Sequence, residues 1–314
     1  MRVLVTGGAG FVGSHVVEVL RAAGHRVAVV DVLDPGRAEF VPADVPLYRV
    51  DVASPQLEEV FREERPQVVC HHAAQASVAV SVREPLRDAR VNVLGTLNVL
   101  ECCVRYGVGR VLFASTGGAI YGEPDRLPVS EDHPTRPVSP YGVHKLCAEQ
   151  YLAAYGHLYG LRWVALRYGN VYGPRQDPYG EAGVVAIFCA AMLEGRQPVI
   201  FGDGQHTRDY VYVEDVARAN LLALEADAQG VFNVGTGVET STRRIFDLVR
   251  DATGFRGEPR YGPARPGDVR RICLDIARAE RVLGWRPRVT LSDGIARTVA
   301  WFRAQARTGR RDVP

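Results

Sequence analysis

A tyrosine and a lysine four positions apart are the side chains of this sequence best suited to acid–base chemistry. Tyr141 and Lys145 would share one face of a helix, and Ser139 before Pro140 predicts that this helix begins here, with the serine as its N-cap. The chain carries 38 lysines and arginines, yet Lys145 is the only lysine. An ammonium beside a phenol favours the phenolate, so it lowers the pKa of the phenol from its usual value of about 10. We therefore predict that Tyr141 is a general acid and base whose pKa Lys145 lowers, although the spacing alone also fits an exposed tyrosine near an isolated lysine.

A glycine-rich turn lies near the start of the chain. Residues 2–6 are mostly β-branched and apolar, as in a short strand, and Gly7, Gly10 and Gly13 follow them before a helical pattern begins. Glycines at this spacing permit a tight turn and a close approach of the backbone to a pyrophosphate, and the N-terminus of the helix attracts phosphate groups. Asp31 ends the next strand-like run, where a carboxylate would bind a ribose diol and disfavour a 2′-phosphate. This order of features predicts a Rossmann-type site for NAD rather than NADP.

The alternation of strand and helix patterns continues as far as Tyr168, which predicts an α/β fold with a doubly wound parallel sheet. Beyond that residue the alternation fades, and we expect a smaller α/β lobe that binds the substrate. The predicted NAD-binding domain spans residues 1–169, with a segment near 206–235 returning to it. The predicted substrate-binding lobe spans residues 170–314.

Further predicted cofactor contacts lie where strand-like runs end. Asp51 and Val52 follow one such run and are placed to meet the adenine, whereas Ala73 and Ala74 follow another and are small enough for a flat ring to lie close. The full set of predicted cofactor contacts is Gly7, Gly10, Phe11, Val12, Gly13, Asp31, Asp51, Val52, Ala73, Ala74, Gln75, Asn92, Tyr141, Lys145 and Tyr168.

Composition argues against several classes of protein. The 314 residues are 46% hydrophobic and 24% charged, as in an ordinary folded protein, and the formal charge of +2 gives no reason to expect a nucleic-acid or membrane-surface binder. No apolar run reaches the length of a membrane span, and a strand directly after Met1 leaves no room for a signal peptide. The six cysteines lack a C-x-x-C spacing, which predicts reduced thiols and a cytoplasmic protein. His71 and His72 have no second cluster at ligand spacing, so no metal is expected.

Two arginines suggest that the substrate carries a diphosphate. Arg208 follows the glycine-rich segment 202–204, and Arg265 lies three residues before Asp268 in a separate loop. A guanidinium presents paired donors that suit phosphate oxygens. Ser77 is a further candidate for a hydroxyl contact to a ligand.

Assembled, these motifs resemble the extended short-chain dehydrogenase/reductases that act on nucleotide sugars, and they are most similar to the UDP-glucose (UDP-galactose) 4-epimerases. The resemblance covers nearly the whole chain, from the glycine-rich turn to Asp268. It implies that Tyr141 is the acid and base and that Lys145 binds the nicotinamide ribose. It also implies that Asn170, Arg208 and Arg265 hold the nucleotide diphosphate of a UDP-sugar, with Asp268 near its ribose and Phe201 near the uracil. The family further implies a homodimer in which helices near 86–106 and 140–159 form a four-helix bundle.

The sequence departs from the family pattern at three positions. Gly117 stands where the family usually has the serine or threonine that bonds the sugar O4. We expect Thr116, Ser115 or a shifted backbone to make this bond instead, and we favour Thr116 as the third catalytic residue. Gly169 replaces an aromatic residue, which we expect to loosen the sugar pocket. Ile272 replaces a larger residue beside the sugar 2-substituent, which would leave room for an N-acetyl group. The predicted substrate contacts are Ser77, Thr116, Gly117, Tyr141, Asn170, Phe201, Arg208, Arg265 and Asp268.

The predicted activity is 4-epimerisation of UDP-glucose and UDP-galactose through a transient 4-keto sugar. A UDP-N-acetylhexosamine or UDP-glucuronate 4-epimerase, or a decarboxylase, shares most of these features and stays open. A dehydratase is disfavoured, because the family places Asp-Glu where this chain has Gly118 and Ala119. A non-catalytic NAD-binding sensor or scaffold is disfavoured because Tyr141 and Lys145 are both present.

Overall fold

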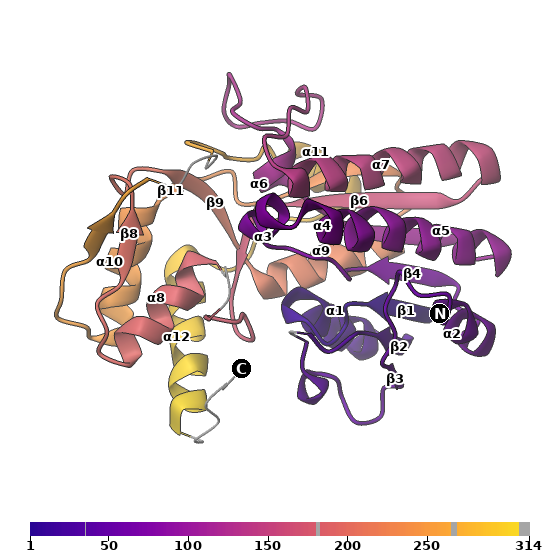
Figure 1. Ribbon diagram of the computed structural model, residues 1–314, viewed down its shortest axis with the longest axis horizontal. Helices are drawn as coiled ribbons and strands as arrows, with labels where there is room; N and C mark the ends of the chain where they lie inside the picture. The colour runs from indigo at the N-terminus through magenta and orange to yellow at the C-terminus, as the bar shows by residue number, and fades with distance from the viewer. Residues whose placement is uncertain (35, 180–182, 265–268, 308–314) are drawn as a thin grey trace.

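A parallel sheet of seven strands forms the centre of the larger part of the molecule (Figure 1). The computed structural model describes residues 1–34, 36–179, 183–264 and 269–307. The sheet has the order β10-β6-β5-β4-β1-β2-β3, and each pair of neighbouring strands is parallel. Its strands are β1 (Arg2–Thr6), β2 (Arg26–Val30), β3 (Leu47–Tyr48), β4 (Val68–His71), β5 (Arg110–Thr116), β6 (Arg162–Tyr168) and β10 (Gly230–Val234). The predicted Rossmann-type architecture is confirmed.

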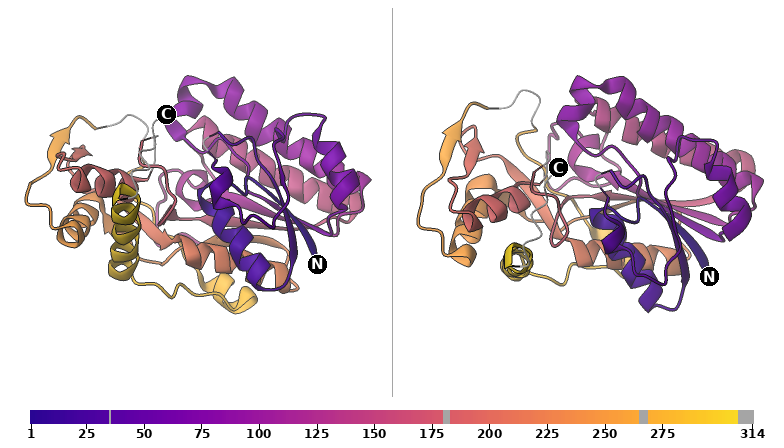
Figure 2. Two further views of the ribbon diagram at one scale, coloured as in Figure 1. Left: turned by 90° about the horizontal axis from the view of Figure 1, so that it is seen from below. Right: turned by 60° about the horizontal axis from the view of Figure 1, so that its bottom comes forward.

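Helices cover both faces of this sheet, which is why its strands are apolar on both sides. Val3 and Val5 of β1 pack into one core with α1 (Phe11–Ala22), α9 (Val213–Glu225) and α11 (Ala277–Leu283). Leu4 of the same strand packs into the opposite core with α2 (Leu57–Glu64), α5 (Gly95–Arg105) and α7 (Pro140–Tyr159). Parallel sheets need this double cover, because their crossover helices occupy the faces. The views from other sides show the two helical layers with the sheet between them (Figure 2).

The helix expected over 86–106 is present, but it is not regular. It comprises α4 (Pro85–Ala89), a π-helical segment η2 (Arg90–Leu94) and α5. A short helix α3 (Val78–Arg83) precedes it, and α3, α4 and η2 all contact α7. A π-helical turn inside a longer helix often accompanies a functional site, and here it contains Asn92, one of the predicted cofactor contacts.

A smaller group of elements lies at the other end of the molecule and has its own apolar core. Its helices are α8 (Val184–Leu193), α10 (Thr242–Thr253) and α12 (Leu291–Arg307). Its strands form one sheet from β7 (Asn170–Tyr172), β9 (Thr207–Tyr212) and β11 (Glu239–Ser241), and a pair from β8 (Val199–Phe201) and β12 (Arg260–Gly262). Within the segment expected to return to the first domain, α9 packs on α1 and β10 joins the large sheet, whereas β9 belongs to the smaller sheet.

The order of the strands fixes where a ligand can bind. The chain passes outward from β1 through β2 to β3, and then returns to β4 on the other side of β1. The strand order therefore reverses between β1 and β4, and the carboxyl ends of the strands at such a point are the usual binding position in this kind of sheet. In the described part of the chain, no helix has the length and apolar character needed to cross a membrane.

Candidate active site

The helix α7 begins where the sequence predicts, and its first turns carry Tyr141 and Lys145. Ser139 is the N-cap, and its hydroxyl accepts a hydrogen bond from the backbone N–H of Gly142 at 3.2 Å. Pro140 occupies the first helical position, where a missing N–H costs nothing. The backbone N–H of Tyr141 donates to the hydroxyl of Ser81 in α3 at 3.1 Å. The start of α7 is thus fixed both by its own cap and by a neighbouring helix.

Lys145 is buried and points to the end of β5. Its ammonium donates to the carbonyl of Ala114 at 2.9 Å and lies 4.7 Å from the ring centre of Phe113. It lies 6.0 Å from the ring centre of Tyr141. Burial lowers the pKa of Lys145 to about 8, because the charged form loses its hydration.

The environment of Tyr141 contradicts one sequence expectation. Burial raises the pKa of the phenol above its ordinary value, and the negative charge of Asp88 raises it further, whereas a hydrogen bond with Thr116 lowers it. The net pKa of Tyr141 is therefore raised and not lowered in this structure, because desolvation is the largest influence, and the stabilising effect of Lys145 on the phenolate stays a prediction.

Thr116 and Asn170 converge near Tyr141. Thr116 is the last residue of β5 and is hydrogen-bonded to the phenol. A Cβ placed on Gly118 would lie 3.4 Å from Oδ1 of Asn170 and 3.8 Å from Oγ1 of Thr116, so both side chains reach the same turn. This turn continues into the short helix α6 (Gly117–Ile120). The structure therefore brings together a phenol, a hydroxyl and an amide at the carboxyl ends of β5 and β6.

Gly117 has no side chain because its surroundings leave no space for one. A Cβ at this position would lie 2.6 and 2.8 Å from the two Cδ atoms of Leu274 and 3.2 Å from the carbonyl oxygen of Arg167. These distances are shorter than van der Waals contact. A serine or threonine at position 117 would therefore require Leu274 to move. Thr116 is the hydroxyl that interacts with Tyr141, whereas the hydroxyl of Ser115 is bound to Glu149.

Gly169 does not loosen the pocket as expected. A Cβ on Gly169 would lie 2.7 Å from the carbonyl oxygen of Asp209, so the backbone of β9 fills the space of the missing side chain. Asp209 is buried and holds this region together through both of its carboxylate oxygens. One accepts bonds from the N–H and hydroxyl of Thr236 at 2.7 and 2.6 Å, and the other from the N–H groups of Gly237 and Leu274 at 3.0 and 3.1 Å.

The turn after β1 has the shape that a pyrophosphate requires. Gly7 has a φ of +71°, and a Cβ there would lie 2.5 Å from the backbone N of Ala73 in the loop after β4. A Cβ on Gly13 would lie 2.0 Å from the carbonyl oxygen of Gly7. No side chain caps the N-terminus of α1, whose first residues are Phe11, Val12 and Gly13, so its N–H groups point to the space in front of the turn. These residues fit a dinucleotide.

Asp31 lies at the end of β2, beside this turn. Its Oδ2 accepts a bond from the N–H of Ala9 at 3.0 Å and its Oδ1 from the N–H of Leu33 at 2.8 Å. Each carboxylate oxygen can accept a second bond, so a ribose diol remains compatible with this geometry.

The residues predicted near the adenine are only partly accessible. Asp51 accepts a bond from the N–H of Ala53 and another from Arg90, each at 2.8 Å. Val52 is buried, with its side chain against Gly95. A contact between Val52 and the adenine would therefore have to involve its backbone.

The loop after β4 is held by side chains that the sequence assigned to the cofactor. The amide of Asn92 donates to the carbonyl of Gln75 at 2.8 Å and accepts from its N–H at 3.2 Å. Asn92 is buried and supports the loop that contains Ala73, Ala74 and Gln75. Tyr168 is also buried, and its phenol is bound to Asn220 and lies 3.3 Å from Nε2 of His72.

The structure gives the two adjacent histidines separate roles. His71 is buried between the hydroxyls of Thr6 and Thr96, at 2.6 and 3.1 Å. His72 stacks on Tyr168 with ring centres 6.4 Å apart. Among the described residues, no group of three or more histidines, cysteines and carboxylates is arranged to hold a metal ion.

The predicted substrate contacts are spread over several segments. Ser77 is the N-cap of α3 and accepts a bond from the N–H of Val80 at 3.0 Å. Arg208 in β9 donates to the carbonyl of Thr207 at 2.8 Å, and Phe201 is partly exposed at the end of β8. Arg265 and Asp268 lie outside the described residues.

A buried ion pair beside the site was missed by the sequence reasoning. Arg167 in β6 binds Glu149 in α7 through two bonds of 3.0 and 2.6 Å, and Ser115 donates to the same carboxylate at 2.5 Å. Arg167 also donates to the phenol of Tyr121 at 2.9 Å. The sequence does place an arginine at the end of an apolar strand, which could have indicated a buried charge. No local pattern, however, shows that its partner is Glu149.

A second missed pair joins Asp88 in α4 to His144 in α7, with Oδ2 2.5 Å from Nδ1. Asp88 is completely buried, and Gln75 donates to its other oxygen at 2.5 Å. Nothing in the sequence around Asp88 distinguishes it from a surface residue of an amphipathic helix.

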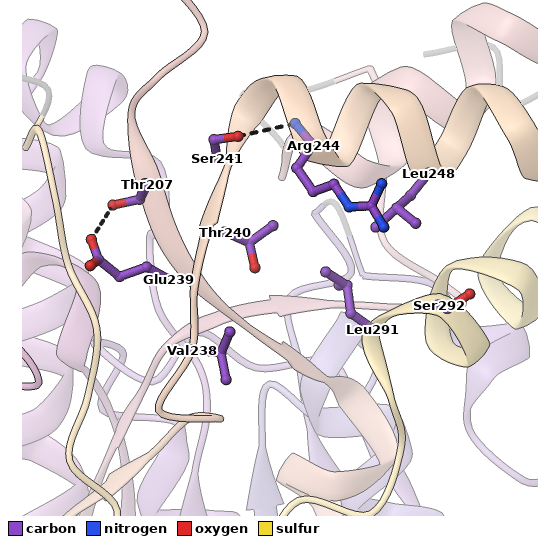
Figure 3. Close-up of a pocket in the computed structure, with 9 residues that line it drawn as sticks. All are labelled: Thr207, Val238, Glu239, Thr240, Ser241, Arg244, Leu248, Leu291 and Ser292. Atoms are coloured by element: carbon purple, nitrogen blue, oxygen red, sulfur yellow. Dashed lines mark hydrogen bonds between the residues drawn. The ribbon is translucent and has the colours of Figure 1, made fainter.

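A cavity of about 490 Å³ in the smaller lobe is separate from the residues around Tyr141. Figure 3 shows its lining residues, which are Thr207, Val238, Glu239, Thr240, Ser241, Arg244, Leu248, Leu291 and Ser292. Thr207 donates to Glu239 at 2.7 Å, and Ser241 caps α10 through the N–H of Arg244 at 3.1 Å. Several of its polar groups already bind one another, and none of the predicted site residues lines it.

The chain is similar to known proteins over nearly its whole length. Residues 3–235 match the NAD dependent epimerase/dehydratase family. The chain is 48% identical over 309 residues to the UDP-glucose 4-epimerase of Mycolicibacterium smegmatis, and the match covers 96% of this chain and 99% of that protein.

Two solved structures are similar over the full fold. One is the UDP-glucose 4-epimerase of Thermotoga maritima with UDP-glucose, with a TM-score of 0.96, 51% identity and coverage of 98% of this chain and 100% of that chain. The other is the UDP-glucose 4-epimerase of Thermus thermophilus in complex with NAD, with a TM-score of 0.93, 52% identity and coverage of 96% and 99%.

Proposed function

Because the chain belongs to the NAD-dependent epimerase/dehydratase family, we propose that it interconverts UDP-glucose and UDP-galactose by inverting C4 of the hexose. The observation that carries this proposal is the convergence of Tyr141, Thr116 and Lys145 at the carboxyl ends of the strands, next to a glycine-rich turn that fits NAD. Relatives at about half identity over the whole chain are named for the same reaction.

Inversion requires that C4 lose and regain a hydride, and that the hydroxyl on C4 lose and regain a proton. NAD, when bound, supplies the acceptor and donor of the hydride at C4. Tyr141, as the phenolate, takes the proton of the 4-hydroxyl as the 4-keto sugar forms, and the resulting phenol returns this proton after the sugar has turned its opposite face to the cofactor. Thr116 holds the oxygen of the hydroxyl through a hydrogen bond, and the ammonium of Lys145 stabilises the phenolate before it takes the proton.

The smaller lobe would hold the nucleotide while the sugar turns. Asn170 reaches the turn that carries Thr116, and we assign it to the part of the diphosphate nearest the sugar. Arg208 and Arg265 would bind the phosphates, with Asp268 at the ribose and Phe201 against the uracil. A firm hold on the nucleotide and a loose hold on the sugar permit the rotation that inversion requires.

The test is to incubate the purified protein with UDP-galactose, adding no cofactor, and to resolve the product sugars. The proposal is supported if the wild-type protein forms UDP-glucose and the Tyr141→Phe variant forms almost none. Unchanged UDP-galactose, even after NAD is added, would contradict it. The same assay with UDP-N-acetylhexosamines and UDP-glucuronate decides whether one of these is the preferred substrate.

We also propose that two copies of the chain form a dimer through α5 and α7. These helices contact each other, and large apolar side chains on this layer are exposed, including Leu86, Leu94, Val143 and Leu158. A second copy would cover them in a four-helix bundle. Leu158→Glu should convert the dimer into a monomer in sedimentation velocity, whereas Val282→Glu, an exposed apolar residue on α11, should not. A monomeric wild type would contradict the proposal.

A cytoplasmic location is proposed from the state of the cysteines. All six are unpaired, and five of them are buried. Disulfide bonds are rare in reducing compartments. Recovery of the protein from an oxidising compartment after cell fractionation would contradict this location.

A further inference from the structure

A buried carboxylate lies between the loop after β4 and the first turns of α7. Asp88 has no exposed surface, and each of its oxygens has one partner at 2.5 Å, Nδ1 of His144 and Nε2 of Gln75. A carboxylate removed from water needs a cation or several donors. The ring N–H of His144 and the amide of Gln75 are the two donors that meet this need.

These contacts connect the two parts of the site. Gln75 belongs to the loop predicted to meet the cofactor, and its side-chain oxygen accepts from the N–H of Ser77 at 2.6 Å. His144 directly precedes Lys145 in α7. Asp88 therefore ties the loop after β4 to the turn of α7 that carries the two catalytic side chains.

The charge of Asp88 also acts on the site. After burial, it is the largest influence that raises the pKa of Tyr141. On α7 itself, Lys145 lies 6.0 Å from the ring centre of Tyr141. Other charged groups on α7 and on the elements that pack most closely against it are engaged elsewhere: Arg83 and Arg87 with Glu84, Arg90 with Asp51, Arg105 with Glu58, Glu101 with Tyr155, Arg110 with backbone carbonyls, Arg162 with Asp227, and Glu149 with Arg167.

We propose that Asp88 and His144 form a positioning pair for Tyr141, which fixes the start of α7 against the loop after β4 and holds the carboxylate of Asp88 at a fixed place near the phenol. This inference rests on the proposed role of Tyr141 as acid and base. It assigns a function to two residues that touch neither the substrate nor the reacting atoms.

The test is the pH dependence of kcat for the full-length protein with NAD bound. Asp88→Asn removes a negative charge at nearly constant shape, so the phenolate forms more easily and the rise of kcat with pH should move about one unit lower. His144→Asn keeps a donor to the carboxylate of Asp88, so the rise of kcat with pH should stay close to its wild-type position. The KM for UDP-galactose should change little in both, because neither residue contacts the substrate.

The matched control is Glu84→Gln, which removes an exposed carboxylate one turn before Asp88. Solvent screens this charge, so the profile should stay in place. An unmoved profile in Asp88→Asn, or an equal shift in Asp88→Asn and His144→Asn, would show that the pair is only a structural support and would overturn the inference.

A second readout covers the case in which Asp88→Asn does not fold. His144→Leu removes one of the two donors to Asp88 and so favours the neutral form of this buried carboxyl group. The phenolate absorbance of this variant, titrated with Tyr141→Phe as the reference, should develop at lower pH than in the wild type, and an unchanged titration would overturn the inference. If Tyr141→Phe retains activity, the proposed function fails. If Tyr141→Phe is inactive but the profiles do not move, only the role of the pair fails.

Discussion

Placing a serine at position 117, where the family resemblance led us to expect a serine or threonine, should destabilise this protein because Leu274 occupies the space. The new Cβ would lie 2.6 and 2.8 Å from the two Cδ atoms of Leu274. Leu274 is completely buried among Tyr121, Val129, Val269 and Ile272. Its backbone is fixed by the N–H bond to Asp209 at 3.1 Å. The side chain of Leu274 cannot move away without disturbing this cluster. We therefore expect Gly117→Ser to lower the free energy of unfolding by about 1–3 kcal/mol.

A double-mutant cycle separates this clash from a general effect of a new side chain. Leu274→Ala leaves a cavity and should cost about 2–5 kcal/mol alone. The double variant should cost less than the sum of the two single ones, with a coupling of about 1–2 kcal/mol, because the alanine removes the clashing atoms. The assay is urea denaturation followed by circular dichroism at a fixed NAD concentration, since bound cofactor changes the apparent stability.

Gly118→Ser is the matched control for this cycle. A Cβ on Gly118 meets its nearest neighbours at 3.4 and 3.8 Å, which is ordinary contact. Its effect on stability should be small. Additive costs of the two changes at 117 and 274, or equal costs at 117 and 118, would refute the argument from packing.

Three further predictions follow from the same site. Thr116→Val should lower kcat for UDP-galactose about 10²–10³-fold with little change in KM, since one hydrogen bond to the reacting oxygen is lost; a loss below tenfold would show that another group supplies the hydroxyl. Burial lowers the pKa of Lys145 from 10.5 to about 8. Between pH 8 and pH 10.5 the unfolded chain therefore holds a proton that the folded chain has lost, so the free energy of unfolding rises with pH in this range. Lys145→Met should remove this rise in urea denaturation, and a rise of the same slope in the variant would contradict the pKa shift. Glu149→Ala should cost about 3–5 kcal/mol in the same measurement, because it leaves the buried guanidinium of Arg167 without its anion, whereas removing the exposed Arg21 of another ion pair should change stability little.

Several features of the site were predictable because they depend on neighbours in the chain. The N-cap Ser139 and the spacing of Tyr141 and Lys145 are properties of one helical segment, and both are present in the structure. The turn after β1 and the position of Asp31 follow from one strand–turn–helix–strand unit. Each depends on interactions within about thirty residues, for which sequence patterns carry a direct physical meaning.

The expectations that failed depend on the space around a side chain and on its solvation in the folded protein. Gly169 was expected to loosen the pocket, but the backbone of Asp209 fills the position. The pKa of Tyr141 was expected to lie below its usual value, but desolvation raises it. Both outcomes depend on which atoms surround a residue after folding, and no pattern within the segment contains that information.

The sequence by itself therefore determined the class of fold, the cofactor turn and the helix that carries Tyr141 and Lys145, because hydrogen bonding and periodicity within a segment decide these. Only the tertiary structure decided that Thr116 meets the phenol, that Leu274 excludes a side chain from position 117 and that Asp88 pairs with His144. These contacts join residues from separate elements, and their chemistry depends on burial, which exists only once the strands and helices have packed together.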